Sequence, residues 1–288
     1  MTYRFCPGHV SCVFQPFPSS DPVMAGSRGF GIRLSLGAHC TAEPRPDGVV
    51  RIVIDGEECQ APVTRHAVLS LAGDMGLDIR ISNDLPVSQG FGMSAAGALS
   101  AALCVCDVLD LPEHDAVVAA HSADVCCGGG LGDVVAIAEC CDIPIRVLPG
   151  MPPYGRMEGM IQSMDNITLA VLGQKMVTGS VLNDPVRMER IREVSGVAMD
   201  AFLDEPTVDS LYEQSNMFSL QSGLESSQVH DALDMLHSEG YRAGMCMLGN
   251  SIFTDAPGHV VRDLLGLDEG DVFVCTSYPG PLRITRTG

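Results

Sequence analysis

The spacing of apolar residues predicts alternating strands and helices in the first half of the chain. Short runs of Val, Ile, Leu and Phe between turn residues are typical of β-strands and lie at residues 10–14, 32–36, 49–54, 77–81 and 143–148. Stretches that suit helices lie at residues 67–73, 94–107 and 113–126. Pro112 directly precedes the last of these, where proline favours a helix start.

The second half continues the mixed pattern. Strands are expected at residues 167–172, 272–276 and 282–285, and helices near residues 184–194, 208–223, 227–239 and 259–265. Between the halves, a turn-rich stretch of proline and glycine at residues 149–155 predicts a domain boundary. We therefore expect one domain at residues 1–155 and a second at 156–288, with no internal repeat. The pattern alone allows an α/β or an α+β fold with two lobes.

A first glycine loop, residues 86–96, runs directly into the alanine-rich helix expected at residue 94. Gly90 and Gly92 can turn backbone N–H groups toward a ligand because no Cβ stands in the way. The N-terminus of the following helix carries a partial positive charge and exposes free N–H groups. This arrangement predicts a site for an anion such as a phosphate.

Other phosphate-binding motifs fit this loop poorly. No Walker A sequence occurs, the only lysine of the chain is Lys175, and neither a His-Arg-Asp nor an Asp-Phe-Gly tripeptide is present. A dinucleotide fingerprint is matched only in degenerate form, by Gly90, Gly92 and Ala95 with Asp110 beyond them. That fingerprint needs a strand ending at its first glycine, whereas a polar turn separates the strand expected at residues 77–81 from the loop.

A second glycine loop, residues 128–133, ends in a single carboxylate. It reads Gly128-Gly129-Gly130-Leu131-Gly132-Asp133. Glycines at this density cost backbone entropy unless the chain must approach something closely. A phosphate cradle combined with an acid on such a loop suggests phosphoryl transfer.

The first glycine loop resembles the second motif of the GHMP kinases, Pro-x3-Gly-x-Gly-x-Ser-Ala-Ala, and all its specified positions match. Other segments resemble the archaeal pantoate kinases within that superfamily: Pro7-Gly8-His9-Val10, Gly26-Ser27-Arg28-Gly29-Phe30-Gly31-Ile32, Ala120-His121-Ser122-Ala123-Asp124-Val125, Gly130-Leu131-Gly132-Asp133-Val134 and residues 244–253. The resemblance implies an α+β, two-lobed GHMP kinase fold. Its N-terminal domain would be like domain 2 of ribosomal protein S5, and its C-terminal domain would be ferredoxin-like.

The same resemblance implies an ATP- and Mg²⁺-dependent kinase that phosphorylates pantoate to 4-phosphopantoate on the archaeal route to coenzyme A. Asp133 would accept or orient the proton of the attacking hydroxyl. The ATP phosphates would lie against residues of the first glycine loop and the helix start, namely Gly90, Gly92, Met93, Ser94 and Ala95. Another small-molecule GHMP kinase, acting on mevalonate, homoserine or a sugar, is the alternative. A nucleotide-binding regulator without turnover is a further one.

Ser94 and Asp124 are the expected Mg²⁺ ligands. The Ser94 hydroxyl could instead cap its helix, and the Asp124 carboxylate could instead be a solvated charge on its helix. Asp124 also departs from the family, because many GHMP relatives carry Glu at this position. With the shorter side chain, contact with the metal through an intervening water is a further possibility.

A hydroxy-acid acceptor needs a cation for its carboxylate, and arginine offers a planar two-pronged match. Arg28 and Arg146 are the candidates because both lie near glycine motifs or the expected catalytic loop. Ser27 and His121 match substrate-site positions of the family. A lone helical histidine is otherwise a core or surface residue, so the role of His121 follows from the resemblance alone.

The formal net charge of −19 argues against a nucleic-acid partner, and any cation that binds ATP or the acceptor must therefore be local. No apolar run is long enough to span a membrane and no signal layout starts the chain, so we expect a cytoplasmic protein without membrane contact. The twelve cysteines are expected to be thiols, because Cys126-Cys127 and Cys140-Cys141 lack the spacing of a zinc site. A homodimer is compatible with the sequence.

Overall fold

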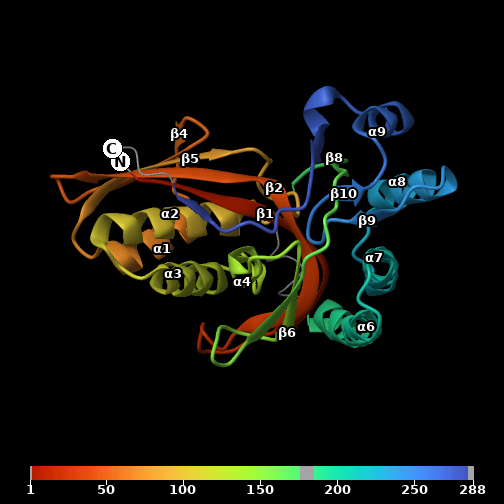
Figure 1. Cartoon of the computed structure of the whole chain (residues 1–288), viewed down its shortest axis with the longest axis horizontal. Coiled ribbons are helices and arrows are strands. Elements are labelled where there is room, and N and C mark those ends of the chain that lie inside the picture. The colour runs from red at the N-terminus through yellow and green to blue at the C-terminus, as the bar shows by residue number, and fades with distance from the viewer. Residues whose placement is uncertain (1, 176–184, 285–288) are drawn as a thin grey trace.

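The computed structural model describes residues 2–175 and 185–284, and within them two β-sheets are flanked by helices (Figure 1). In the first sheet the strands follow the order β12-β1-β2-β5-β3-β4, with β6 paired to β2 and β7 paired to β6. Their bounds are β1 Thr2–Phe17, β2 Gly26–Arg45, β3 Val50–Ile54, β4 Glu57–Glu58, β5 Gly76–Asn83, β6 Ile143–Leu148, β7 Arg156–Met160 and β12 Arg283–Ile284.

Strands β1 and β2 form a long antiparallel pair in this sheet. The strands predicted at residues 10–14 and 32–36 are the middle of this pair, where Val10 lies opposite Ile32. Both strands extend much further than predicted, because small and polar residues continue the hydrogen-bonded pairing of β1 with β2 wherever one face of the sheet is covered. The register shifts twice, between Pro7 and His9 and between Ser11 and Val13. Such bulges bend a strand and redirect its side chains.

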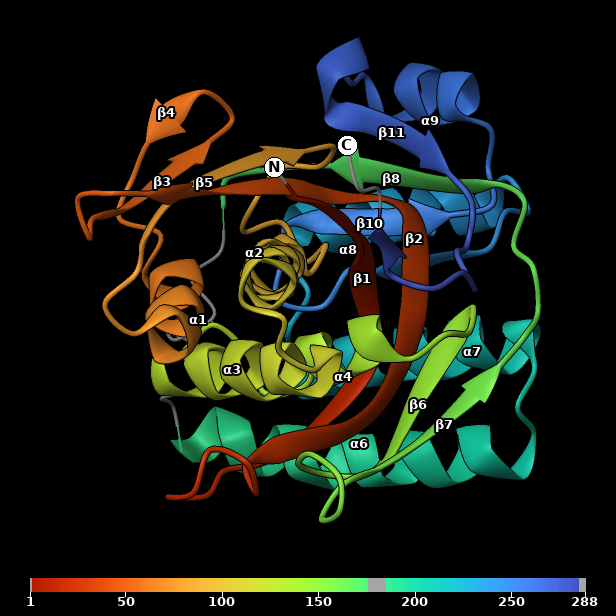
Figure 2. The same ribbon diagram turned by 60° about the vertical axis from the view of Figure 1, so that its left-hand side comes forward.

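Helices α1 Pro62–Ala72, α2 Met93–Leu109 and α3 Glu113–Cys126 cover one face of the first sheet (Figure 2). Helix α2 is buried at nearly every position from Met93 to Cys106, which explains its run of Ala, Leu, Val and Cys. Helix α3 and strand β6 have the predicted bounds. The short helix α4 Asp133–Ala138 was not predicted, since its few residues follow a glycine run that favours a loop.

The second sheet has the order β11-β8-β10-β9, and its helices follow the predicted pattern closely. The bounds are β8 Ile167–Val171, α6 Pro185–Asp204, α7 Val208–Ser222, α8 Ser227–Ser238, β9 Ala243–Met245, β10 Ser251–Thr254, α9 Gly258–Leu265, the 3-10 turn η1 Glu269–Asp271 and β11 Val272–Cys275. Helix α6 is longer than predicted. Two predicted ends, Asp184 and Thr285, lie outside the described residues.

Two segments beyond the predicted boundary at residue 155 belong to the first sheet. Strand β7 pairs with β6, and β12 pairs with β1, so the chain returns to the first sheet after completing the second. Buried Arg33 on β2 holds this return segment by donating hydrogen bonds to the carbonyl oxygens of Tyr278 and Gly280. The exact division of the chain into domains stays a prediction.

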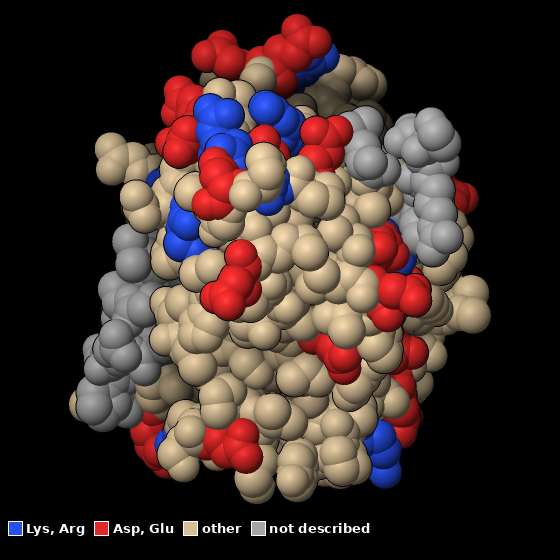
Figure 3. Space-filling model, turned by 90° about the vertical axis from the view of Figure 1, so that its left-hand side faces the viewer, with Lys and Arg blue, Asp and Glu red and all other residues tan. Residues whose placement is uncertain are grey.

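All twelve cysteines are free thiols, and most are buried. Within the described ranges, no helix is long and apolar enough to cross a membrane. On the face drawn in Figure 3, basic side chains stand among acidic ones. Arg45 pairs with Asp47 and Asp78, and Arg51 pairs with Glu58. These two basic side chains therefore have acidic partners beside them.

Candidate active site

The first glycine loop adopts the shape that its glycines predict. Gly90 and Gly92 have φ values of 76° and 65°, in the left-handed region that side chains disfavour. A Cβ on Gly90 would lie 2.7 Å from the carbonyl oxygen of Cys246, and one on Gly92 would lie 2.9 Å from that of His9. The loop therefore packs backbone to backbone against β1 and against the segment between β9 and β10.

The start of helix α2 is open toward a ligand. Its N-cap is Gly92, and no side chain caps it. Ser94 is exposed at the second helical position, so the alternative that this hydroxyl caps the helix is wrong. The first N–H groups of a helix have no partner within it. They and the Ser94 hydroxyl are available to an anion or to its metal.

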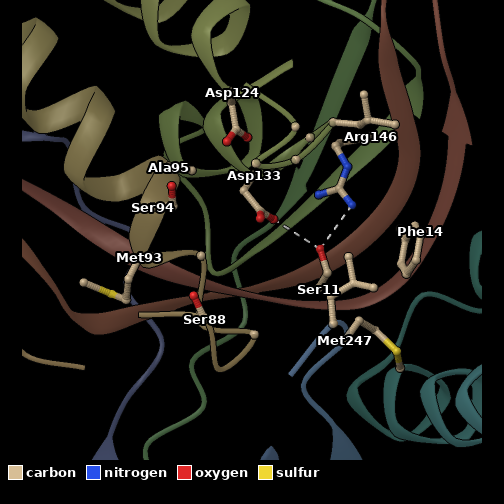
Figure 4. Close-up of a pocket in the computed structure, with 18 of the residues that line it drawn as sticks. Ser11, Phe14, Ser88, Met93, Ser94, Ala95, Asp124, Asp133, Arg146 and Met247 are labelled. Carbon is tan, nitrogen blue, oxygen red and sulfur yellow. Dashed lines mark hydrogen bonds between the residues drawn. The ribbon is translucent and has the colours of Figure 1, made fainter. Parts of the chain in front are cut away.

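The two glycine loops line one cavity of about 410 Å³. Its walls come from β1, the first glycine loop, the start of α2, α3, the second glycine loop, β6 and the segment after β9 (Figure 4). The predicted residues that line it are Gly90, Gly92, Met93, Ser94, Ala95, Asp124, Asp133 and Arg146. Ser11, Phe14, Ser88, Lys175, Met247 and Leu248 line it as well, and sequence reasoning did not single them out.

Asp133 is held by His9. The His9 Nδ1 and Asp133 Oδ1 atoms are 2.8 Å apart, and an ionised carboxylate only accepts, so Nδ1 carries the proton and donates it. Burial would raise the pKa of Asp133, but the hydrogen bond from His9 and the positive charge of Arg146 outweigh it and lower that pKa. Burial, with the nearby Arg146 and Arg33 charges, lowers the pKa of His9. The pair is thus a neutral imidazole and a carboxylate at neutral pH.

His9 has no freedom to turn away. Its side chain is 1% exposed, and its Nε2 atom is buried without a hydrogen-bond partner among the described residues. A Cβ on Gly31 would lie 2.5 Å from that Nε2, so glycine on the neighbouring strand makes room for the ring. An imidazolium would leave a second N–H unpaired here, which is costly in a buried site. The sequence signal that could have found His9 was its place in the Pro-Gly-His-Val segment.

Ser11 connects Asp133 to Arg146. Its Oγ donates to Asp133 Oδ1 at 3.4 Å and accepts from Arg146 Nη2 at 3.5 Å, as the dashed lines in Figure 4 show. Arg146 is 1% exposed, and its Nε and Nη1 atoms are buried without a partner in the described ranges. Burial lowers the pKa of Arg146, but a guanidinium stays protonated in proteins. A buried cation that keeps unpartnered N–H groups at a cavity wall is suited to an anionic ligand.

Asp124 lies on the other side of the cavity, on α3, and is 3% exposed. It is not a solvated helical charge, so that alternative is wrong. Burial, together with the negative charge of Asp133, raises its pKa to about 8. A Cβ on Gly130 would lie 2.7 Å from Asp124 Oδ2. The second glycine loop therefore closes over this carboxylate, and a cation in the cavity would relieve the repulsion between the two acids.

The remaining substrate candidates lie around the cavity but do not line it. Ser27 is buried behind Gly132. His121 is 1% exposed, one turn before Asp124; its Nε2 is 3.0 Å from the carbonyl oxygen of Ala25, and burial lowers its pKa. Arg28 donates to the carbonyl oxygen of Val147 and faces Asp200 at 3.7 Å, outside the cavity. Of the two arginine candidates, only Arg146 reaches the site.

The chain matches curated relatives over most of its length. A pantoate kinase of Methanospirillum hungatei is 30% identical over 283 residues, which cover 96% of this chain and 93% of the relative. The chain belongs to the pantoate kinase family. A pantoate kinase of Methanocaldococcus jannaschii is 27% identical over 95% of this chain and 99% of its own length. The sequence profile of the GHMP kinases N terminal domain matches residues 62–139, which include the helix after the first glycine loop and the whole second loop.

Solved structures agree on the fold. A protein described as a phosphotransferase related to the CoA biosynthesis pathway superimposes with a TM-score of 0.88 at 23% identity, over 99% of this chain and 98% of its own. A galactokinase of Lactococcus lactis in complex with galactose gives a TM-score of 0.70 at 13% identity, over 98% of this chain and 94% of that one. The expected two-lobed GHMP kinase fold is confirmed, and the dinucleotide-binding alternative is wrong.

Proposed function

We propose that the protein transfers the γ-phosphoryl group of ATP to the 4-hydroxyl of pantoate and so makes 4-phosphopantoate for coenzyme A synthesis. The observation that carries this function is one cavity shared by an open helix start, a hydrogen-bonded carboxylate and a buried arginine with unpartnered N–H groups. Full-length likeness to pantoate kinases supports the choice of acceptor.

The nucleotide side of the site is the first glycine loop. Backbone N–H groups at the start of α2, including those of Met93, Ser94 and Ala95, would hold the phosphates together with the helix dipole. Lys175, the only lysine in the sequence, also lines the cavity and adds a mobile point charge for a phosphate.

A magnesium ion fits the residues present. The Asp124 carboxyl group is buried near the Asp133 carboxylate, a bound cation would favour its ionised form, and the Ser94 hydroxyl lines the same cavity. In the described ranges no three His, Cys, Asp or Glu side chains converge as metal ligands. Magnesium bound by Ser94 and Asp124 would therefore take its other ligands from phosphate oxygens and water, as it does in many kinases. When bound, it would neutralise charge on the transferring phosphoryl group.

Asp133 acts on the acceptor hydroxyl. Its carboxylate, fixed by the His9 Nδ1–H group, accepts a hydrogen bond from the 4-hydroxyl and aims the oxygen at the γ-phosphorus. As the new P–O bond forms, the bond from the γ-phosphorus to the bridging oxygen breaks and ADP leaves. The hydroxyl proton passes to Asp133. Because the pKa of Asp133 is low, its main contribution is orientation and electrostatic stabilisation.

Arg146 would bind the acceptor carboxylate. The planar Arg146 guanidinium lines the cavity, and its Nη1 atom has no hydrogen-bond partner among the described residues, so a carboxylate there would gain a charge-assisted hydrogen bond. Binding there would add a second anionic partner to a buried charge that faces the Asp133 carboxylate alone within the described ranges. Ser27 and His121, packed behind the cavity wall, would support the second glycine loop and α3.

The decisive test is a panel of acceptors with ATP and magnesium, monitored for ADP release. Pantoate should give turnover, and mevalonate, homoserine and galactose should give little. Turnover with one of those three instead would reassign the acceptor within the GHMP kinases. ATP binding without ADP formation from any acceptor would make the protein a nucleotide-binding regulator and refute the proposed function.

A further inference from the structure

The Ser11 hydroxyl lies between the two groups that would hold the ends of the acceptor. Asp133, for the attacking hydroxyl, is 3.4 Å away, and Arg146, for the carboxylate, is 3.5 Å away. Ser11 lines the cavity itself, so a ligand that spans the two groups must pass over it (Figure 4). The family resemblance assigned no role to this residue.

The Ser11 hydroxyl can still make one hydrogen bond to a ligand. A serine hydroxyl has one donor and two acceptor lone pairs. Its proton is directed to Asp133, and one lone pair accepts from Arg146. One lone pair remains. A ligand group that meets Ser11 without displacing these contacts must therefore be a hydrogen-bond donor.

The position of Ser11 is fixed from two sides. It stands at the register shift of β1 between Ser11 and Val13, next to the strand pairing with Gly31. Its carbonyl oxygen accepts a hydrogen bond from the Met247 N–H at 3.3 Å, which ties it to the segment after β9. A hydroxyl on a backbone held in this way loses little freedom when a ligand arrives, so its contact can discriminate between ligands.

We propose that Ser11 recognises the 2-hydroxyl of the acceptor and makes the enzyme specific for 2-hydroxy acids. The inference rests on the proposed function. Along pantoate, the carboxylate comes first, the 2-hydroxyl next and the 4-hydroxyl last, which is the order of Arg146, Ser11 and Asp133 in the cavity. Phe14 and Met247 line the same cavity and offer apolar surface to the methyl groups on carbon 3.

Two analogues lack the donor that Ser11 requires. The 2-deoxy acid, 4-hydroxy-3,3-dimethylbutanoate, has no oxygen there and leaves the lone pair without a partner. The 2-oxo acid would place its carbonyl oxygen, a hydrogen-bond acceptor, against the free lone pair of Ser11. This contact is unfavourable unless the Ser11 hydroxyl turns its proton from Asp133 toward that oxygen. A site built to hydrogen-bond a substrate group discriminates against analogues that lack it. Both analogues keep the carboxylate and the 4-hydroxyl, so they remain able to react.

The experiment measures kcat/KM for the three acids with wild-type protein and with Ser11→Ala. The wild type should favour the 2-hydroxy acid over the 2-deoxy acid by about 10- to 100-fold, the worth of one or two hydrogen bonds in a buried site. In Ser11→Ala that ratio should fall to within about threefold, because the variant loses activity mainly with the 2-hydroxy acid. A ratio that stays at the wild-type value would overturn the inference, as would a wild type that does not discriminate.

Ser88→Ala is the matched control, since Ser88 lines the same cavity from the first glycine loop and, within the described ranges, makes no hydrogen bond to Asp133 or Arg146. It should leave the ratio of the two acids unchanged. If Ser11→Ala does not fold, Ser11→Cys takes its place, because a thiol is a poor acceptor. Absence of turnover with all three acids in the wild type would instead count against the proposed function. The two failures are thus distinguishable.

Discussion

The two glycine loops use glycine for different physical reasons. In the first, Gly90 and Gly92 adopt left-handed φ values and touch backbone carbonyl groups, so glycine shapes the main chain that would bind phosphate. In the second, Gly130 and Gly132 make room for the side chains of Asp124 and Arg146. Only Gly128 of that loop has a left-handed φ. One loop presents main-chain groups, whereas the other places charges.

The largest effect is expected at the carboxylate that the second loop delivers. Asp133→Asn should lower kcat by about 10²- to 10⁴-fold, because the neutral amide loses the negative charge that orients and stabilises the attacking hydroxyl and cannot accept its proton. It should leave ATP binding near the wild-type level, since the first loop is untouched. Steady-state kinetics and nucleotide titration measure the two effects. A kcat near that of the wild type would remove Asp133 from the reaction.

Alanine in each loop separates the two uses of glycine. A Cβ on Gly132 would clash with Ser27 Oγ and lie 2.7 Å from Arg146 Nε, while its φ of −162° is open to any residue. Gly132→Ala should therefore displace Arg146 and lower kcat/KM for pantoate by about 10- to 100-fold, with little change in KM for ATP. Kinetics with each substrate varied in turn provide the measurement.

Gly90→Ala is the matched variant in the first loop. It combines a left-handed φ with a backbone clash, so we expect a stability loss of roughly 1–3 kcal/mol and a raised KM for ATP. Thermal unfolding and ATP kinetics measure this. If Gly132→Ala raised KM for ATP and Gly90→Ala affected only the acceptor, the division between the loops would be reversed.

The support that His9 gives to Asp133 should show in the pH profile. Hydrogen bonding to His9 lowers the Asp133 pKa, and activity that needs the carboxylate is present above that pKa and lost as pH falls through it. His9→Ala removes the Nδ1–H donor and should raise the pKa of Asp133, so activity should begin to fall at a higher pH. It should also lower kcat by about tenfold.

His9→Asn offers the control, because an asparagine amide can place its N–H near the position of Nδ1. It should restore much of the wild-type pH profile. A role of His9 in packing alone would predict equal profiles for the Ala and Asn variants, with both differing from the wild type only in stability.

The smallest effect is expected at Ser94, where substitution should leave the stability of the protein nearly unchanged. Ser94 does not cap α2, so Ser94→Ala should alter the free energy of unfolding by less than about 0.5 kcal/mol. KM for ATP should rise, since the hydroxyl faces the cavity. Chemical denaturation and ATP kinetics test both. A clear loss of stability with unchanged KM would return Ser94 to a structural role.

The sequence predicted the helices and strands whose apolar residues follow a regular spacing. It missed features that depend on contacts with distant parts of the chain. The bounds of α3 and β6 were predicted correctly, because their apolar periods are complete within the segment. The length of β1 and β2 was missed, since it depends on cover from α2 and α6. Ser94, Asp124, Asp133 and Arg146 converge as expected, whereas His9 and Ser11 acquire meaning only through contacts with residues more than a hundred positions away.

The most direct measurement of the central claim is the phosphorus NMR spectrum of the product formed from ATP and pantoate. Transfer at the site between the two loops predicts a phosphate ester on carbon 4, whose phosphorus signal is split by the pair of protons on that carbon. A signal split by a single proton would place the phosphate on the 2-hydroxyl and contradict the order in which Arg146, Ser11 and Asp133 hold the acceptor.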